Sequence, residues 1–511
     1  MTDLTKPRAG APLTGAARGN VLYRDWLDNE ATVALASTVT KESGTGEWFG
    51  SDEARSWASE HRQDLPGEGR ARFDHDLAAL HRGDASVVVT GQQPGFLGGP
   101  LLTIHKIATA VALADRLSAA GKPTIPVFWS GDDDDDLVEA LDLWAWRPPR
   151  GLVRSRDWLK TRVGDGPRRR LGTLGPEAWF DAEGDWFGGG AGADDDLELG
   201  RQWQRTLTAG DDWRTLVRRC LLAAFRGCGL MVVSGDDSRL HAAAGGFYAE
   251  VSARRTELAE LVHAQGRRLE AEGGHAQISD RSLSRSLYVL DGDMRRPLGK
   301  ETVPVDGSVR PGIMLRSLLQ DRMLAPRAVV VGPGELAYLS QLEPLYRALG
   351  IVRSPLVPRL AAWLLPRSMD RELLDAHHRI TSAGAGVDEA VASWLHDNST
   401  SLEVLLQREL DLPADRARYL AGRRRSRWER GVRSLIRGEQ ARIRTAGPRE
   451  PEWVFPAGRR QERGLAWIPV LALGGRRLRD LVLRAADAHL EAGACGDWRE
   501  WECEIDEPHV F

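Results

Sequence analysis

Residues 86–114 read SVVVTGQQPGFLGGPLLTIHKIATAVALA, and this stretch decides the fold class. Its first part, Val87 to Thr90, is a run of β-branched residues, which favours a buried strand. A glycine-rich loop follows, and apolar residues then recur at helical spacing, at Ile104, Ile107, Ala108, Val111 and Ala114. A strand, a glycine loop and a helix in this order form the repeating unit of a parallel sheet covered by helices.

The same pattern recurs three more times. Strands are predicted over residues 125–129, 230–233 and 328–331, and each ends in a loop of glycine or acidic residues. In open α/β sheets, ligands bind outside the carboxyl ends of the strands. We therefore expect an α/β fold with a parallel-sheet core, in which the four loops meet at one cleft that serves as the active site.

Five segments are predicted along the chain. The sheet core is divided between residues 1–150 and 213–369, and a Trp-rich and glycine-rich insertion over 151–212 connects its halves. Apolar residues at helical spacing and a lack of strand signals predict a helical, coiled-coil arm over 370–447. Residues 448–511 are expected to return to the core.

The Arg-rich part of this arm, residues 416–444, has more than one interpretation. A basic patch can bind nucleic acid, but no aromatic stacking ladder or binding motif accompanies this one. A solvated helix face, or contact with the acidic surface of a dimer partner, agrees better with the sequence. We therefore expect no nucleic-acid partner.

Composition and charge exclude several classes of protein. Of 511 residues, 42% are hydrophobic and 28% charged, and the net charge is −4, as in ordinary globular proteins and unlike disordered chains. No apolar run is long enough to cross a bilayer, and the N-terminal residues lack the apolar stretch of a signal peptide. We expect a soluble cytoplasmic protein with no membrane partner. Four cysteines without a C-x-x-C pair indicate neither a disulfide framework nor a zinc ribbon, and Cys220 and Cys228 are expected to be buried thiols.

The loop after the first strand offers candidates for anion binding. Small residues in the loop 91–95 let backbone N–H groups approach a phosphate or carboxylate, and a helix begins close by. On that helix, Lys106 could neutralise an anion and His105 could donate to one. The loop matches no nucleotide-binding motif, however, and a structural turn with ordinary surface polar residues explains it about equally well.

Asp132 to Asp136 form a run of carboxylates at the end of the second strand, with Glu139 beyond them. Such a cluster can hold a substrate amine, act as a general base or ligate Mg²⁺. Crowding of like charges should raise the pKa of at least one of these carboxyl groups. The alternative is a solvated acidic loop. Because a tight array of identical charges is costly to leave unpaired, we expect a cationic ligand or a neighbouring Arg.

A second glycine turn, residues 332–335, connects the fourth strand to its helix. Arg310, Arg316 and Arg359 lie around it in the sequence, and a guanidinium group can pair with a carboxylate or phosphate through two hydrogen bonds. The position of these groups at equivalent strand ends favours an enzyme that acts on a small anionic substrate.

Several motifs together resemble those of one family. The segments TGQQPGFLGGPLLTIHKI from Thr90, FWSGDDDDDLVE from Phe128, IMLRSLLQD from Ile313, VGPGELAYLSQL from Val331 and VFPAGRRQER from Val454 occur in the order found in the bacillithiol biosynthesis cysteine-adding enzymes. The similar motifs extend from about residue 87 to residue 467. Each motif is short, but their combination is specific.

This resemblance implies a Rossmann-like core related to class I aminoacyl-tRNA synthetases, with connecting insertions and a coiled-coil arm that forms a homodimer. It also implies a ligase that joins the carboxyl group of L-cysteine to the amino group of glucosaminyl-malate, the last step of bacillithiol biosynthesis. Activation of the cysteine by ATP, with Mg²⁺ accompanying the nucleotide, is a hypothesis. No metal site of the protein's own is predicted.

The predicted site residues form two groups. Catalytic roles are predicted for Asp133, Asp134, Asp136, His105 and Lys106. Substrate binding is predicted for Thr90, Gly91, Gln92, Gln93, Gly95, Thr103, Trp129, Arg316, Gln320, Asp321, Gly332, Gly334, Glu335, Tyr338, Gln341 and Arg359.

The acidic loop departs from the pattern of the family that it resembles. That pattern is typically Glu-Asp-His-Asp, whereas residues 133–136 are all Asp. The role of the missing His would fall to His105, to Asp135 with a shifted pKa, or to no residue. Two other functions stay open: a nucleotidyl-transferring enzyme or a ligase for another amine on the same scaffold, and a homodimeric binding protein that has lost catalysis.

Overall fold

The computed structural model describes residues 7–13, 21–41, 46–65, 67–147, 151–154, 169–175, 198–272, 276–278, 286–299, 302–304, 306–366, 400–408, 413–424, 453 and 460–505. The chain divides into two compact units. The larger one consists of Met1–Ala16, Asn20–Arg367 and Trp453–Phe511, and the smaller one of Ala17–Gly19 and Ser368–Glu452.

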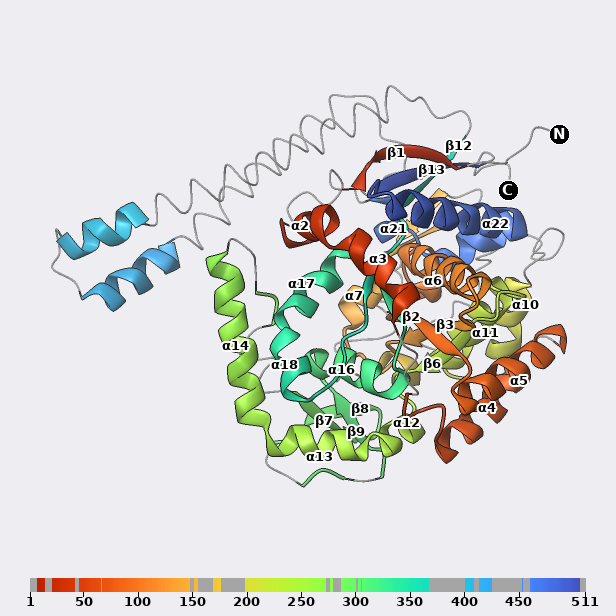
Figure 1. Cartoon of the computed structure of the whole chain (residues 1–511), viewed down its shortest axis with the longest axis horizontal. Helices are drawn as coiled ribbons and strands as arrows, with labels where there is room; N and C mark the ends of the chain where they lie inside the picture. The colour runs from red at the N-terminus through yellow and green to blue at the C-terminus, as the bar shows by residue number, and fades with distance from the viewer. Residues whose placement is uncertain are drawn as a thin grey trace. The chain divides into compact units, whose positions relative to one another are not determined.

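A five-stranded sheet forms the centre of the larger unit (Figure 1). Its strands follow the order β11 (Leu356–Pro358), β10 (Ala328–Val331), β2 (Ser86–Gln92), β3 (Thr124–Ser130) and β6 (Met231–Ser234), and every neighbouring pair is parallel. All residues of β3 and β6 are buried, as expected of parallel strands that have both faces covered. The prediction of an α/β fold with a parallel-sheet core is confirmed.

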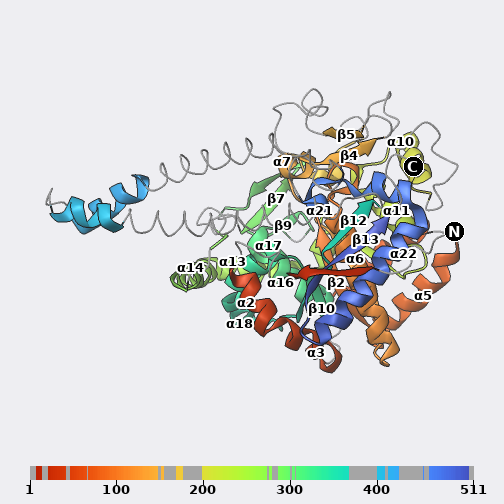
Figure 2. The same ribbon diagram turned by 90° about the horizontal axis from the view of Figure 1, so that it is seen from above.

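Helices cover this sheet. The helix α6 (Leu102–Ala119) packs on β2, β3 and β10, and the long helix α22 (Trp467–Ala494) packs on the outer side of α6 (Figures 1 and 2). Most residues of α6 are buried, because sheet and helix enclose it from two sides. The remaining helices are α2 (Val21–Asn29), α3 (Ala31–Thr40), α4 (Asp52–Asp64), α5 (Gly67–Arg82), α7 (Leu137–Leu141), α10 (Leu199–Ala209), α11 (Trp213–Ala224), α12 (Ser238–Ala243), α13 (Gly245–Ala253), α14 (Arg255–Ala271), α16 (Ile313–Leu324), α17 (Pro333–Gln341), α18 (Glu343–Ala348) and α21 (Gln461–Gly464), with short 3-10 turns η1 (Phe96–Gly98) and η2 (Leu171–Thr173).

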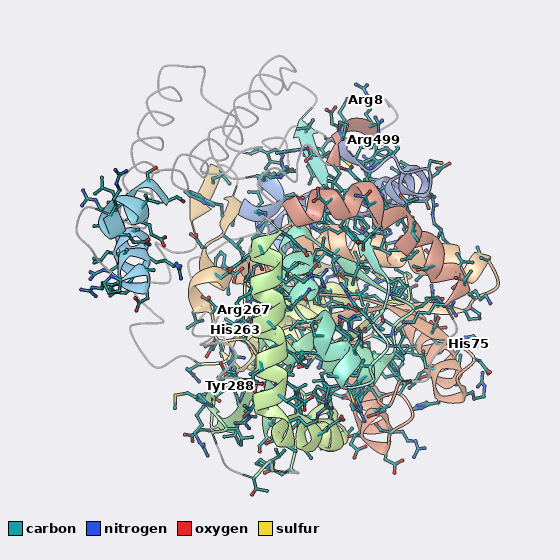
Figure 3. The ribbon with its side chains drawn as sticks, turned by 60° about the vertical axis from the view of Figure 1, so that its left-hand side comes forward. Arg8, His75, His263, Arg267, Tyr288 and Arg499 are labelled. Atoms are coloured by element: carbon teal, nitrogen blue, oxygen red, sulfur yellow. The ribbon has the colours of Figure 1, made fainter. Side chains whose placement is uncertain are left out.

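Three small sheets surround the core. Strand β13 (Arg499–Ile505) pairs with β1 (Arg8–Pro12) on one side and with β12 (Ala362–Pro366) on the other. Figure 3 labels Arg8 and Arg499, which belong to two of these paired strands. Strands β4 (Trp144–Arg147) and β5 (Gly151–Arg154) form a hairpin, and β7 (Leu287–Asp291) pairs with β8 (Met294–Pro297) and β9 (Val309–Pro311).

A C-terminal segment is joined to the loop that follows β2. Leu101 N donates to Leu465 O at 2.7 Å, and Trp467 N donates to Gly99 O at 3.0 Å. The indole Nε1 of Trp467 donates to the carbonyl oxygen of Gly98 at 2.6 Å. Gly98 has a φ of +92°, and a Cβ atom there would lie 2.4 Å from the same indole nitrogen, so this close contact requires glycine.

The structure also bears on the other predictions. Residues 400–408 and 414–424 of the predicted arm are helical, and the rest of 370–447 lies outside the described residues. The proposed segment boundaries stay predictions. Cys220 is buried as expected, but Cys228 is only partly buried, and no disulfide joins the four cysteines. No helix within the described ranges is long and apolar enough to span a membrane.

Candidate active site

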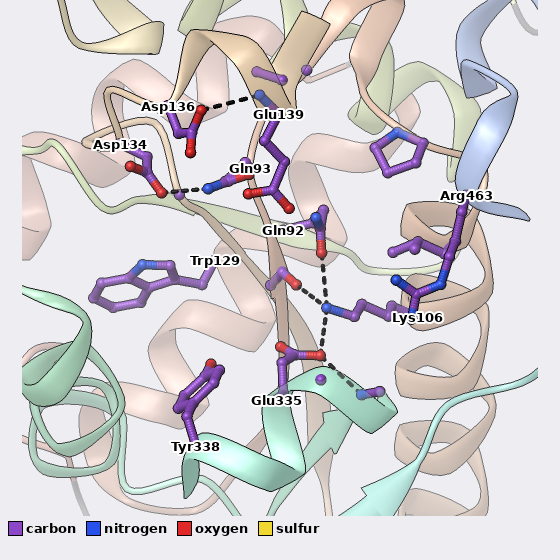
Figure 4. Close-up of a pocket in the computed structure, with 18 of the residues that line it drawn as sticks. Gln92, Gln93, Lys106, Trp129, Asp134, Asp136, Glu139, Glu335, Tyr338 and Arg463 are labelled. Atoms are coloured by element: carbon purple, nitrogen blue, oxygen red, sulfur yellow. Dashed lines mark hydrogen bonds and ion pairs between the residues drawn. The ribbon is translucent and has the colours of Figure 1, made fainter. Parts of the chain in front are cut away.

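A cavity of about 1180 Å³ lies at the carboxyl ends of the central strands (Figure 4). Its lining includes Gln92 after β2, Asp134 after β3 and Glu335 after β10. The first and last of these residues are more than 240 positions apart in the chain, and the parallel topology brings all three to one edge of the sheet. The loops therefore share one cavity, as the sequence predicts.

Most of the predicted site residues line this cavity. They are Gly91, Gln92, Gln93, Gly95, Lys106, Trp129, Asp134, Asp136, Arg316, Gln320, Gly332, Gly334, Glu335, Tyr338 and Arg359. Six others do not line it, namely Thr90, Thr103, His105, Asp133, Asp321 and Gln341.

Lys106 connects the two glycine loops. Its Nζ lies 2.7 Å from Glu335 Oε2 and donates to Gly91 O at 2.7 Å and to Gln92 Oε1 at 2.9 Å (Figure 4). Burial lowers the pKa of Lys106, and the carboxylate of Glu335 opposes that effect. The three protons of the ammonium group therefore all have protein acceptors, so Lys106 joins the loops together.

Glu335 also caps the helix α17. Its Oε2 accepts a hydrogen bond from Gly332 N at 2.9 Å, at the helix end where negative charge is favoured. A Cβ atom at Gly332 would lie 3.1 Å from Arg359 Nε, which explains a glycine at this close approach. Gly332 lines the cavity, and its amide already has a side-chain acceptor, the carboxylate of Glu335.

Asp134 presents a charged carboxylate to the cavity. Its Oδ1 lies 3.0 Å from Arg295 Nη2, its Oδ2 lies 3.7 Å from Arg316 Nη1, and the side-chain amide of Gln93 donates to Oδ2. Burial acts to raise the pKa of Asp134, but the two guanidinium groups outweigh it and hold the pKa below its ordinary value. The expected neighbouring Arg residues are thus present, and Asp134 stays ionised.

Two other carboxylates of the acidic loop are turned away from the cavity. Asp133 is buried and accepts a hydrogen bond from Arg316 Nη2 at 3.0 Å, and burial raises its pKa. Asp132 is also buried, accepts from Ser234 Oγ at 2.8 Å, and burial raises its pKa to about 7. This placement does not support the catalytic role predicted for Asp133, because its side chain is buried against Arg316 and does not line the cavity.

Asp136 and Glu139 stand at the start of α7. Asp136 caps this helix, with Oδ1 accepting from Glu139 N at 3.1 Å. The side chain of Glu139 is exposed at the cavity. Partial burial raises the pKa of Glu139, and the charges of Asp136 and Asp134 raise it further. The guanidinium group of Arg463 opposes this rise. Glu139 is therefore the cavity carboxylate whose pKa is shifted toward neutral pH.

The opposite side of the cavity carries guanidinium groups. Arg359 makes a two-pronged pair with Glu462, with Nη1–Oε2 and Nη2–Oε1 distances of 2.8 Å each. Arg460 pairs with Glu500 and stacks 4.8 Å above the ring of Trp363. Arg463 is exposed at the cavity, and Figure 4 shows it across from Asp134 and Asp136. The residues around α21 thus complete the site.

The remaining predicted residues have structural roles. His105 precedes Lys106 on α6 and points about 100° away from it, into a buried position where its Nδ1 lies 3.5 Å from Glu462 Oε2. Burial lowers the pKa of His105, so it does not replace the missing imidazole at the cavity. Thr90 Oγ1 donates to Val330 O at 3.0 Å and ties β2 to β10, and Thr103 is buried in the first turn of α6.

Asp321, Gln341 and Arg310 also lie away from the cavity. Asp321 accepts from Ser354 Oγ at 2.8 Å, and Gln341 accepts from the backbone of Ile278 at 3.0 Å. Arg310 is wholly buried and donates to Asp236 at 2.8 Å, so the anion-binding role expected for it is wrong.

Sequence reasoning did not assign several lining residues to the site. Glu139 was recognised only as a neighbour of the acidic run, and Arg463 only as part of the QER motif. No sequence pattern indicated that Arg460 or Gln277 lines the cavity. Among the described residues, no group of three or more His, Cys, Asp or Glu side chains is arranged to hold a metal ion.

Comparison with known proteins identifies the fold family. Residues 60–305 match the family model described as the N-terminal Rossmann-like domain of bacillithiol biosynthesis BshC. Relatives named "Putative cysteine ligase BshC" include proteins of Geobacillus thermodenitrificans (26% identical), Bacillus velezensis (25%) and Koribacter versatilis (27%). The alignments cover 63%, 59% and 58% of this chain and 63%, 60% and 58% of the relatives, so the chain spans about three fifths of their length. Residues 60–305 are therefore similar to the Rossmann-like domain of the BshC family, and the longer alignments are to proteins named as putative cysteine ligases of that family.

Proposed function

We propose that this protein is a cytoplasmic ligase that joins the carboxyl group of L-cysteine to the amino group of glucosaminyl-malate. The observation that carries the proposal is the charge distribution in the cavity. An ionised Asp134 and the exposed Glu139 lie on one side, and the exposed guanidinium of Arg463 lies on the other. An aminosugar that carries malate has an amine and two carboxylates, which match these two sides.

Each side of the cavity has a chemical task in this reaction. Asp134 is ionised and suits the substrate's ammonium group, which it would orient through a charge-assisted hydrogen bond. An ammonium cannot attack a carbonyl carbon, so a base must take its proton. Glu139 suits this role, because its pKa is raised toward that of a useful base and its side chain is exposed at the cavity.

Arg463 is the proposed contact for the malate carboxylates. It is exposed at the cavity, whereas Arg359 and Arg460 are engaged with Glu462 and Glu500. A planar guanidinium can hold a carboxylate through two hydrogen bonds. The spacing of Arg463 across from Asp134 supports binding of the amine and the malate at opposite ends of one ligand.

Activation of the cysteine carboxylate is proposed to use ATP with Mg²⁺. The residues present fit a nucleotide in one respect: Gly334 lies at the cavity with open space where a Cβ atom would be, at the start of α17. ATP would convert the carboxylate into an acyl group with a good leaving group.

A homodimer through the helical arm is part of the proposal. The helices at residues 400–408 and 414–424 expose Val404, Leu405 and Tyr419. Apolar side chains exposed together on a helical hairpin favour a partner surface. Light scattering of the purified protein measures the mass of the assembly, and a monomer at micromolar concentration would contradict this part.

The reaction is tested by incubating the protein with L-cysteine, glucosaminyl-malate, ATP and Mg²⁺, followed by mass spectrometry and nucleotide analysis. The expected result is the cysteinyl amide together with AMP or ADP. Asp134→Asn should abolish product while the protein remains folded. Product without consumption of ATP would refute the activation route, and the absence of product with the wild-type protein would refute the ligase proposal.

A further inference from the structure

Arg295 lies outside the cavity, on the edge of the three-stranded sheet. It belongs to β8, whose other residues are exposed, yet only 9% of the Arg295 side chain is exposed. It is absent from the lining of the cavity. Because burying a charged side chain is costly, a buried guanidinium group on an exposed strand needs a partner of opposite charge.

That charge is the acidic loop after β3. Arg295 Nη2 lies 2.8 Å from Asp135 Oδ1 and 3.0 Å from Asp134 Oδ1, and Nη1 lies 3.8 Å from Asp133 Oδ2. One guanidinium group thus contacts three successive carboxylates from behind the cavity. Asp134 is the member of this trio that reaches the cavity, so Arg295 touches the site residue on the side away from the substrate.

Arg295 is itself held in place. Its guanidinium stacks 4.9 Å from the ring centre of Tyr288 on β7, a residue labelled in Figure 3. The turn between the two strands is tied to η2, because Arg170 N donates to Asp293 O at 2.9 Å and Arg170 Nη1 donates to Gly292 O at 3.1 Å. Because η2 also bonds the acidic loop, through Leu171 N and Asp134 O at 2.8 Å, hairpin and loop are connected at two places.

Arg316 does not duplicate this role. It contacts Asp133 and Asp134 too, but it lines the cavity, so its substitution would remove a wall of the site as well as a charge. Arg295 can be altered without changing the lining. It therefore offers a way to disturb the position and charge of Asp134, through the acidic loop, while the side chains that line the cavity stay unchanged.

We propose that Arg295 is a positioning residue that fixes the carboxylate of Asp134, ionised and directed into the cavity. Without a cation at this place, the three consecutive Asp residues that Arg295 contacts repel one another more strongly, and Asp134 loses one of the contacts that set its orientation. The inference rests on the proposed function, in which Asp134 orients the substrate ammonium. It adds that Arg295 supplies the positive charge that holds one carboxylate of the Asp-only loop in position for this task.

The test compares Arg295→Met, Arg295→Lys and Arg296→Met in the ligase assay. Arg296 is the next residue of the same strand and is exposed, so its substitution removes the same charge from the other face of the strand. Arg295→Met should lower kcat/KM by about 10- to 100-fold, because small displacements of an orienting group are costly. Arg295→Lys should recover part of the loss, and Arg296→Met should stay within about twofold of the wild type.

The pH profile separates positioning from a general loss of structure. The charged groups around Asp134 are Arg295 on β8, Arg316 on α16, and Asp133 and Glu139 in its own segment. Loss of one cation raises the pKa of Asp134, so the acidic limb of kcat/KM should move to higher pH in Arg295→Met and remain in place in Arg296→Met. An unchanged kcat/KM and pH profile in Arg295→Met would overturn the inference.

A crystal structure of Arg295→Met keeps this test independent of the proposed function. If the wild-type protein makes no product, the ligase proposal fails, but the position of Asp134 can still be observed. The inference requires the Asp134 carboxylate to leave Gln93 and turn from the cavity in the variant. An Asp134 side chain that stays in place would refute it, whatever the activity.

Discussion

Replacing Glu462 by Gln removes one negative charge from a buried cluster while keeping the size of the side chain. Glu462 is 5% exposed and pairs with Arg359 through two contacts of 2.8 Å. The Nε atom of Arg460 lies 3.5 Å from Glu462 Oε1. The guanidinium groups outweigh the effect of burial and hold the pKa of Glu462 well below its ordinary value.

The expected loss of folding stability follows from the charges that remain in the variant. In Glu462→Gln, Arg359 remains buried without its carboxylate, while Arg460 keeps Glu500. Breaking a buried ion pair by removing one partner typically costs about 3–5 kcal/mol, a large part of a total stability of about 5–15 kcal/mol. A second substitution, Arg359→Met, removes the stranded cation, so Glu462→Gln/Arg359→Met should be more stable than Glu462→Gln.

The assay is urea unfolding followed by tryptophan fluorescence at several pH values. Because the folded-state pKa of Glu462 lies below its unfolded value of about 4.3, its contribution is complete above that value and is lost as the pH falls through the folded pKa. The wild type should therefore lose more stability than the variant below about pH 4. Glu257→Gln, at an exposed pair with Arg254, serves as control and should leave the midpoint unchanged. A change of less than about 1 kcal/mol in Glu462→Gln at pH 7 would refute the reasoning.

Three further predictions concern other parts of the molecule. Gly98→Ala should destabilise the protein by more than about 2 kcal/mol in the same unfolding assay, because of its φ of +92° and the indole of Trp467, whereas Gly245→Ala, with open space around it, should not. Arg463→Met should raise the KM for glucosaminyl-malate by about 10- to 100-fold, measured by initial rates, since a hydrogen bond to a charged group is worth about 1.5–3 kcal/mol; an unchanged KM would contradict its role. Glu139→Gln should lower kcat by about 100-fold and move the fall in activity at acidic pH to lower pH, because the base works only when ionised, above its raised pKa, and the ionisation of Asp134 then sets the limb; an acidic limb that stays at its wild-type pH would assign the base elsewhere.

The sheet and four of its five strands could be predicted because each of the four carries a local signal. Val87 to Thr90 and residues 328–331 are β-branched runs that a strand buried on both faces requires. The edge strand β11 was not predicted, since Leu356–Pro358 is three residues long and is flanked by prolines.

The convergence of the loops could be predicted as well, but the direction of each side chain could not. His105 and Lys106 are adjacent in the sequence, and only the packing of α6 between the sheet and α22 decides that Lys106 faces the cavity. Likewise, Arg295 gave no signal, because its partners lie about 160 residues away and an ion pair leaves no periodic pattern. Contacts of this kind depend on tertiary structure alone.

The hydrogen bonds between residues 465–467 and the loop after β2 have a consequence for folding during synthesis. Asp134 and Lys106 leave the ribosome more than 300 residues before Arg463 does. A nascent chain can thus assemble the early strands while its substrate chamber still lacks the wall that carries the guanidinium groups. Pairing of β10 with β2 across some 240 residues adds a slow, long-range closure step. A chain that has not yet been extended to residue 463 therefore lacks one wall of the cavity.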